Sequence, residues 1–205
     1  MRGYSDRINH ALAFTAKHYG SRVPTGMAFG YLVHPASAGL FLARHGCEEA
    51  TIVAGIVHYV LEESVGRERA AMEDKIGEKF GPVVLAVARE AVEPKYGAKG
   101  DERPWRICKQ DYLMTLSGAE PRALDICVAD EIQCCGTTLT ALRRLGVEYL
   151  RTVSSAGATQ TIWWYRSLFE VLDGREEWPH RAMLEELRQL STQLVRALRT
   201  HEEEV

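Results

Sequence analysis

The chain has 205 residues, enough for one large domain or for one domain with a small appendage. Its 25 Lys and Arg residues are slightly outnumbered by 28 Asp and Glu, which gives a net charge of −3. The chain thus lacks the excess of basic residues that binding to DNA or RNA usually requires. No apolar run approaches the ~20 residues of a membrane span, and the N-terminus is polar without an apolar signal core. We therefore expect a cytoplasmic protein with no nucleic-acid and no membrane partner.

Five cysteines are present, an odd number that forms neither a CxxC pair nor a Cys/His zinc motif. They are Cys47, Cys108, Cys127, Cys134 and Cys135. This usage predicts no disulfide framework and favours a reducing compartment.

Helical periodicity runs through almost the whole chain, and no strand-like alternation interrupts it. Prolines near the first turn and glycines just past the last turn mark most helix boundaries, and Ser5 is a good N-cap for the first helix. Loops are predicted over residues 20–30 and 93–105, which are rich in glycine. Helices are predicted, in chain order, over about 5–19, 36–46, 48–64, 68–80, 82–92, 105–116, 119–145, 159–173 and 180–201.

The helix over 48–64 is apolar around most of its circumference, which predicts the central buried helix of an all-α domain. We expect residues 1–175 to form this main domain. Residues 176–205 are expected to form a C-terminal helix that is either an appendage or a contact between copies in a homo-oligomer. Its narrow apolar stripe consists of Leu184, Leu187, Leu190, Leu194 and Leu198.

Polar side chains interrupt the apolar helices at a few positions that could carry chemistry. His34 precedes a proline at a loop-to-helix junction, His58 lies in the central helix, and Asp130 lies in a long apolar helix. Two imidazoles and one carboxylate suit manganese, iron or zinc, and a buried carboxylate is costly unless it is paired or binds a metal. Glu62 or Glu63 could then act as a general base on a metal-activated water.

A structural interpretation competes with this metal site. A histidine in an apolar helix is more often a hydrogen-bonded core residue, and Asp130 could instead cap a helix or pair with an arginine. By residue type alone, His10, His18 and His45 have equal claims to a ligand role.

The chain also has cationic and aromatic side chains that could contact a phosphorylated ligand. The segment around 95–109 is locally basic, and it is either a solvated surface or a rim that faces phosphates. Arg22 in the first loop could pair with a phosphate or stack on a base. The aromatic residues at 163–165 are more often core than a stacking platform.

The order of these segments resembles that of the HD-domain metal-dependent phosphohydrolases. The resemblance is to the branch of the RelA/SpoT hydrolase domain and the small guanosine tetraphosphate hydrolases. GYLVHP is similar to an opening that ends in Y-x-x-H-P, GIVHYVLEES to a helix with H-D-x-x-E-D, and CVADEIQC to K-x-A-D-x-x-x-N. The resemblance covers about residues 6–172 and implies a single helical HD-domain bundle.

This resemblance implies a divalent metal, usually manganese, on His34, His58 and Asp130. It also implies that Glu62 and Glu63 act on the water. The implied ligand is a phosphorylated small molecule, guanosine tetraphosphate or another nucleotide or phosphoester.

Two cations match substrate-binding positions of the family. Arg22 falls close to an arginine that contacts the base. Lys109 matches a lysine that faces the phosphates.

Three positions depart from the family pattern. Tyr59 replaces the aspartate ligand, Cys127 replaces a lysine, and Cys134 replaces an asparagine. A neutral phenol is a poor metal ligand because its ordinary pKa is ~10. The alternative is therefore a catalytically inactive HD fold that binds a nucleotide or a partner, with no metal at all.

Overall fold

The computed structural model describes residues 4–20, 30–97, 99–146 and 157–203. Within these ranges the chain is helical and has no strand, and Tyr96 and Glu102 form an isolated bridge. The prediction of an all-α protein is confirmed. The helices are α1 (Asp6–Tyr19), α2 (Val33–Arg44), α3 (Glu49–Glu63), α4 (Gly66–Phe80), α5 (Pro82–Glu90), α6 (Trp105–Gly118), α7 (Pro121–Leu145), α9 (Ala158–Asp173) and α10 (Arg181–Glu203).

Most helix boundaries lie within two residues of the predicted ones, and α2 shows how one was misplaced. This helix begins at Val33, not after Pro35, so His34 lies in its first turn. The first turn tolerates Pro35 because backbone N–H groups there have no partner within the helix. Ala36 then donates to the carbonyl of Leu32 at 3.1 Å.

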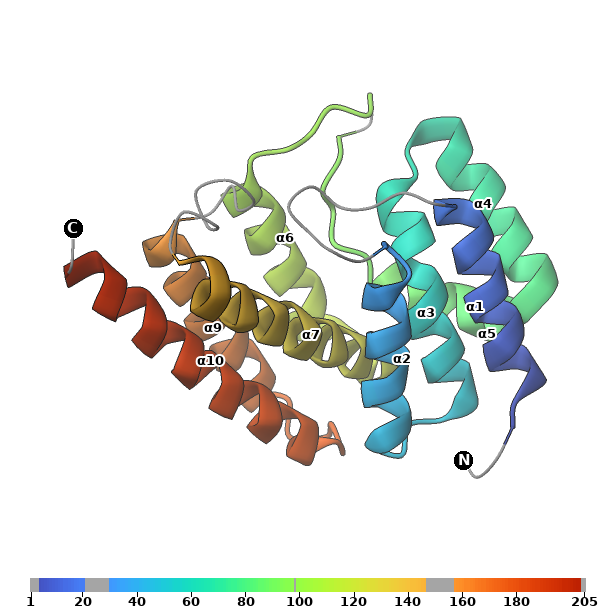
Figure 1. Cartoon of the computed structure of the whole chain (residues 1–205). Coiled ribbons are helices and arrows are strands. Elements are labelled where there is room, and N and C mark those ends of the chain that lie inside the picture. The colour runs from blue at the N-terminus through green and yellow to red at the C-terminus, as the bar shows by residue number, and fades with distance from the viewer. Residues whose placement is uncertain (1–3, 21–29, 98, 147–156, 204–205) are drawn as a thin grey trace.

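Helix α3 is the centre of the molecule, as predicted. All twelve residues from Thr51 to Glu62 are buried, and the helix packs against α1, α2, α5 and α7. Figure 1 shows α1 to α5 gathered at one end of the molecule and α6, α9 and α10 at the other, with α7 running between the two groups. Helices α3 and α7 therefore meet where the two groups join.

Two glycines allow α2 and α3 to pack closely. A Cβ atom added to Gly55 would lie 2.4 Å from Cδ1 of Leu42, and one added to Gly39 would lie 2.9 Å from Cγ1 of Ile56. Neither distance is compatible with a real side chain. The close packing fixes the spacing between the two helices that carry the predicted histidine ligands.

Helix α10 packs along α7 and α9. Its predicted stripe enters the core through Leu184, Leu187, Leu194 and Leu198, with Leu190 partly buried against it. Trp178, just before the helix, is also fully buried. A role for α10 as a contact between copies, and the division of the chain at residue 175, stay predictions.

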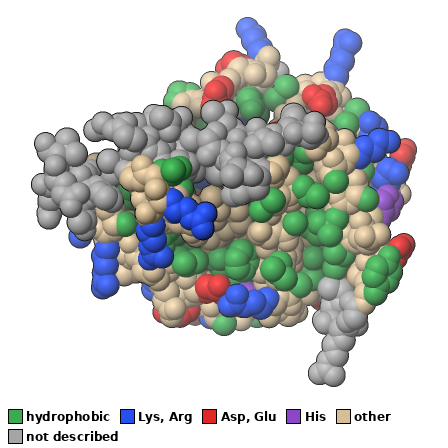
Figure 2. All heavy atoms as spheres, viewed as in Figure 1, with side chains coloured by type: hydrophobic (Ala, Val, Ile, Leu, Met, Phe, Trp, Pro, Cys, Tyr) green, Lys and Arg blue, Asp and Glu red, His purple; other side chains and the backbone are tan. Residues whose placement is uncertain are grey.

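The surface carries charges of both signs. Figure 2 shows Lys and Arg side chains interspersed with Asp and Glu, with hydrophobic side chains between them on this face. Leu40, Met114 and Leu145 are among the exposed hydrophobic residues. Among the described helices, none combines the length and apolar character needed to cross a membrane.

Candidate functional site

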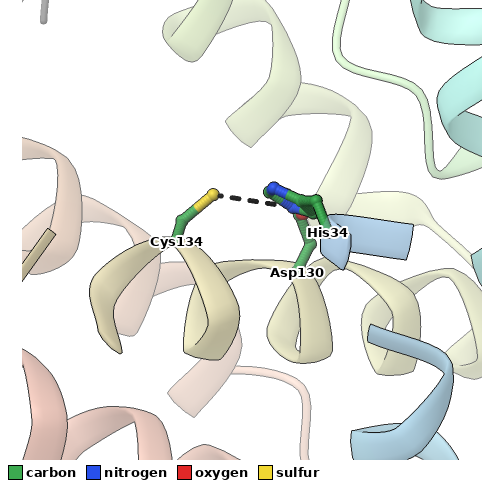
Figure 3. A group of neighbouring side chains, drawn as sticks. All are labelled: His34, Asp130 and Cys134. Atoms are coloured by element: carbon green, nitrogen blue, oxygen red, sulfur yellow. Dashed lines mark hydrogen bonds and ion pairs between the residues drawn. The ribbon is translucent and has the colours of Figure 1, made fainter. Parts of the chain in front are cut away.

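His34 and Asp130, predicted as metal ligands, lie in direct contact. Nε2 of His34 is 2.5 Å from Oδ1 of Asp130, although the residues are 96 positions apart in sequence. His34 comes from the first turn of α2 and Asp130 from the middle of α7, and Figure 3 shows their side chains meeting above α7. Both side chains are partly buried, so the contact lies near the surface.

Cys134 lies one helical turn after Asp130 and therefore faces the same side of α7. Its Sγ atom is 3.8 Å from Nε2 of His34 (Figure 3). The possible ligand atoms of His34, Asp130 and Cys134 all lie within 4.8 Å of one another. Burial and the charge of Asp130 raise the pKa of the Cys134 thiol, so the thiol is protonated in this arrangement.

The side chain of Tyr59 reaches Asp130 and His34 from α3. Its hydroxyl donates a hydrogen bond to Oδ1 of Asp130, the atom that also contacts His34. Its ring meets the His34 ring edge-on, with 4.6 Å between centroids. Burial and the charge of Asp130 raise the pKa of Tyr59 well above its ordinary value, which keeps the phenol protonated.

The ionisation of Asp130 follows from these neighbours. Burial alone would raise its pKa, but the charge of His34 and the hydrogen bonds from His34 and Tyr59 lower it below the ordinary value. Asp130 is therefore a carboxylate at neutral pH, and this anion is held by protein groups on two sides.

His58 is fully buried beside Tyr59, with 4.0 Å between the ring centroids. Its Nδ1 is 2.8 Å from the carbonyl oxygen of Gly55, so Nδ1 carries the proton and donates it. Burial lowers the pKa of His58, although Glu62 and Asp130 oppose this effect, and the ring is neutral. Nε2 then carries the lone pair, which is the form of histidine that binds metals.

Glu62 lies one turn after His58 and is buried. Its carboxylate forms an ion pair with Lys95 and accepts a hydrogen bond of 3.2 Å from the backbone N–H of Glu93. Burial would raise its pKa, but the charge of Lys95 and the hydrogen bond that Lys95 donates lower it. Glu62 is therefore ionised and held in one orientation.

Lys109 is buried between two carboxylates. Its Nζ atom lies 2.9 Å from Glu93 and 3.4 Å from Glu131, and 4.1 Å from the centre of the Trp164 ring. Burial would lower the pKa of Lys109, but these carboxylates raise it. Lys109 is thus a cation whose charge is already matched by the protein, and its contact with a phosphate stays a prediction.

Two of the remaining predicted residues differ in burial. Glu63 is exposed at the end of α3, and Cys127 is buried in the hydrophobic core, where burial raises the pKa of its thiol. Arg22 lies outside the described residues. All five cysteines are free, as predicted.

Two acidic residues of this region were missed by sequence reasoning. Glu93 follows a predicted helix, and its sequence offers no signal beyond a charge in a loop. Glu131 directly follows Asp130 in an otherwise apolar helix and is buried. Two adjacent acids in an apolar run could have indicated that both are paired, because an unpaired buried carboxylate is costly.

The donor atoms at His34 fit a divalent metal ion by type. Imidazole nitrogen and carboxylate oxygen bind manganese, iron and zinc, and thiolate sulfur shifts the preference towards softer ions such as zinc. The phenol of Tyr59 is an obstacle, because its hydroxyl donates to Oδ1 of Asp130, the carboxylate oxygen that also contacts His34. A metal could bind His34 and Asp130 once Tyr59 has left this oxygen.

Comparison with solved structures supports the expected HD-domain-like fold. No family model and no curated protein matches the sequence. The 1.85 Å crystal structure of lmo0812 from Listeria monocytogenes EGD-e is similar with a TM-score of 0.65 and 16% identity, over 85% of this chain and 99% of that chain. A metazoan ortholog of SpoT, described as hydrolysing ppGpp, is similar with a TM-score of 0.65 and 18% identity, over 92% of this chain and 98% of that chain. At these identities the likeness establishes the fold alone.

Proposed function

We propose that this chain is an HD-type phosphohydrolase that acts on guanosine tetraphosphate or on another nucleotide or phosphoester with a divalent metal. The observation that carries this proposal is the contact between His34 and Asp130, with Cys134 beside it, at the junction of α2 and α7. The SpoT ortholog of similar fold is described as hydrolysing ppGpp, and this supports the substrate class.

His34, His58 and Asp130 are the proposed metal ligands, and manganese is the first candidate. When bound, such a metal polarises a phosphoryl oxygen and lowers the pKa of a water molecule. The lone pair on Nε2 of His58 supports this assignment, because its other ring nitrogen is committed to the carbonyl of Gly55.

Glu62 is the proposed proton acceptor, and Glu63 assists at the exposed end of the helix. The ion pair with Lys95 and the N–H of Glu93 hold the Glu62 carboxylate ionised, so it can orient the attacking water and accept its proton. Arg22 and Lys109 are the proposed contacts of the base and of the phosphates.

The test is turnover by the purified chain supplied with Mn²⁺. Guanosine tetraphosphate and a panel of nucleotides are offered, and released phosphate and pyrophosphate are measured. Glu62→Gln should abolish release while Glu170→Gln, an exposed position on α9, should leave it unchanged. Absence of any product under all metal conditions would overturn the catalytic proposal.

A second function is favoured by the position of Tyr59. Because its hydroxyl and ring already contact Asp130 and His34, the chain could bind a nucleotide or a partner without metal and without turnover. Equilibrium binding of labelled nucleotides, with and without a chelator, separates the two functions. Binding that survives chelation and gives no product supports this second function, whereas loss of binding on chelation contradicts it.

A further inference from the structure

A second group of metal-ligand side chains lies away from His34, where the start of α10 meets the rest of the molecule. Cys47 lies in the turn between α2 and α3, Asp125 in the second turn of α7, and His180 directly before α10. Nδ1 of His180 is 2.6 Å from Oδ1 of Asp125 and 3.9 Å from Sγ of Cys47. All three possible ligand atoms lie within 4.8 Å of one another.

The three side chains differ in burial in a way that leaves access for an ion. Cys47 is 2% exposed, and the side chain of Asp125 is 4% exposed. The His180 side chain is 27% exposed and forms the solvent side of the group. An ion from solution can therefore reach donors that are otherwise buried.

Trp178 fixes the orientation of the carboxylate. Its Nε1–H donates to Oδ1 of Asp125 at 2.7 Å, and the indole itself is fully buried. Metal-binding carboxylates in proteins are commonly oriented by a hydrogen bond of this kind. Asp125 is thus positioned by a group that cannot itself be a ligand.

A nucleophilic Cys-His-Asp triad does not fit this geometry. In such a triad the acid contacts one imidazole nitrogen and the nucleophile the other. Here Cys47 and Asp125 both approach Nδ1 of His180. Burial and the nearby Asp125 also raise the pKa of the Cys47 thiol, which is the opposite of what a reactive cysteine needs.

We propose that Cys47, Asp125 and His180 bind a divalent metal ion of borderline softness, with Zn²⁺ as the first candidate. Sulfur, nitrogen and oxygen donors together are typical of zinc sites. A thiolate and a carboxylate carry two negative charges, so a divalent ion makes this buried group neutral. Three protein ligands leave one position of a tetrahedral site open, on the side of His180.

The distances need a small adjustment on binding. Zinc–nitrogen and zinc–sulfur bonds of about 2.0 and 2.3 Å place tetrahedral ligand atoms about 3.5 Å apart, which is near the distance from Nδ1 of His180 to Sγ of Cys47. The hydrogen bond between His180 and Asp125 must open, and the ion takes the place of its proton. That proton moves to Nε2 of His180, and the thiol proton of Cys47 is released to solvent.

A metal here would join three segments that are far apart in the sequence. The start of α10 would be linked to the α2–α3 turn and to α7, so the ion should stabilise the folded chain. The proposal does not depend on the proposed phosphohydrolase function, because none of its residues contributes to the His34 site.

The experiment uses Co²⁺ as a spectroscopic substitute for Zn²⁺ in the full chain. All proteins carry Cys134→Ser, which removes the only thiol found within reach of His34 among the described residues. We expect one equivalent of Co²⁺ to give a thiolate-to-cobalt charge-transfer band. We also expect Zn²⁺ to abolish this band by displacement and to raise the melting temperature.

Two further substitutions in the same background identify the ligands. Cys47→Ser should abolish the band and the thermal shift, and His180→Asn should weaken Co²⁺ binding about tenfold or more. Far-ultraviolet circular dichroism verifies that each variant is folded, and the partly exposed His180 provides the test if Cys47→Ser is not. No band with Cys134→Ser alone, or a band of unchanged affinity in the folded variants, would overturn the proposal.

Discussion

The hydroxyl of Tyr59 donates a hydrogen bond to the same carboxylate oxygen of Asp130 that contacts His34. Oδ1 of Asp130 in α7 is thus contacted by one side chain from α2 and one from α3. In the HD-type pattern that the sequence resembles, this position is an aspartate. Tyr59 therefore places a neutral hydroxyl, hydrogen-bonded to Asp130, where the resemblance implies an anionic metal ligand.

Replacing Tyr59 with aspartate should create a tighter manganese site. The substitution frees Oδ1 of Asp130 and adds a second carboxylate, so we expect Tyr59→Asp to bind Mn²⁺ about 10–100-fold more tightly than the wild type. Electron paramagnetic resonance of free Mn²⁺ measures this directly. Tyr59→Phe is the control, because it also frees Asp130 but adds no ligand. Equal affinity of Tyr59→Asp and Tyr59→Phe would contradict a ligand role for this position.

Glu62 should contribute to stability in a pH-dependent manner. Its pKa in the folded protein is lowered from the ordinary value of 4.5, because the charge of Lys95 and the hydrogen bond that Lys95 donates outweigh the cost of burial. Its contribution is therefore complete above pH 4.5 and is lost as the pH falls through the lowered value. Urea denaturation between neutral and acidic pH should show a smaller loss of stability in Glu62→Gln than in the wild type. The curve of Glu170→Gln should parallel that of the wild type, and parallel curves for all three proteins would refute the ionic role of Glu62.

Gly55 should be intolerant of a methyl group. An added Cβ would collide with Leu42, which is fully buried and has little room to move, so we expect Gly55→Ala to destabilise the fold by about 1–3 kcal/mol. Gly136 is the matched control in α7, where a Cβ meets nothing within 4 Å. Gly136→Ala should stabilise the fold by about 0.5–1 kcal/mol, since alanine loses less backbone entropy in a helix. Thermal denaturation distinguishes the two, and stabilisation by both substitutions would show that α2 and α3 can separate.

The C-terminal helix should contribute directly to the stability of the core. Leu187 is fully buried in α10, and Leu187→Ala is expected to cost about 2–5 kcal/mol in chemical denaturation. Gln189→Ala, on the exposed side of the same helix, should change stability by at most about 0.5 kcal/mol. A small effect of Leu187→Ala would indicate that α10 is an appendage in solution.

The sequence predicts the helices well because their apolar periodicity and their terminal prolines and glycines are local features. It also predicts that His34 and Asp130 belong to one site, through the order of the motifs. Sequence reasoning did not place the Tyr59 hydroxyl on Asp130, since that contact depends on how α3 crosses α7. It also missed Glu131 as a partner of Lys109, because pairing between α6 and α7 is set by packing over a distance of 22 residues.

The ion pairs around Lys109 imply that an anionic ligand could contact this lysine only by replacing a carboxylate that already contacts it. Glu62, Lys95, Glu93, Lys109 and Glu131 form a cluster of three acidic and two basic side chains that are joined by ion pairs. The carboxylates of Glu93 and Glu131 already occupy the positions beside Nζ of Lys109 that a phosphate would take. Its binding would therefore displace one of them or be accompanied by proton uptake, and calorimetry in buffers of different ionisation enthalpy would reveal that proton.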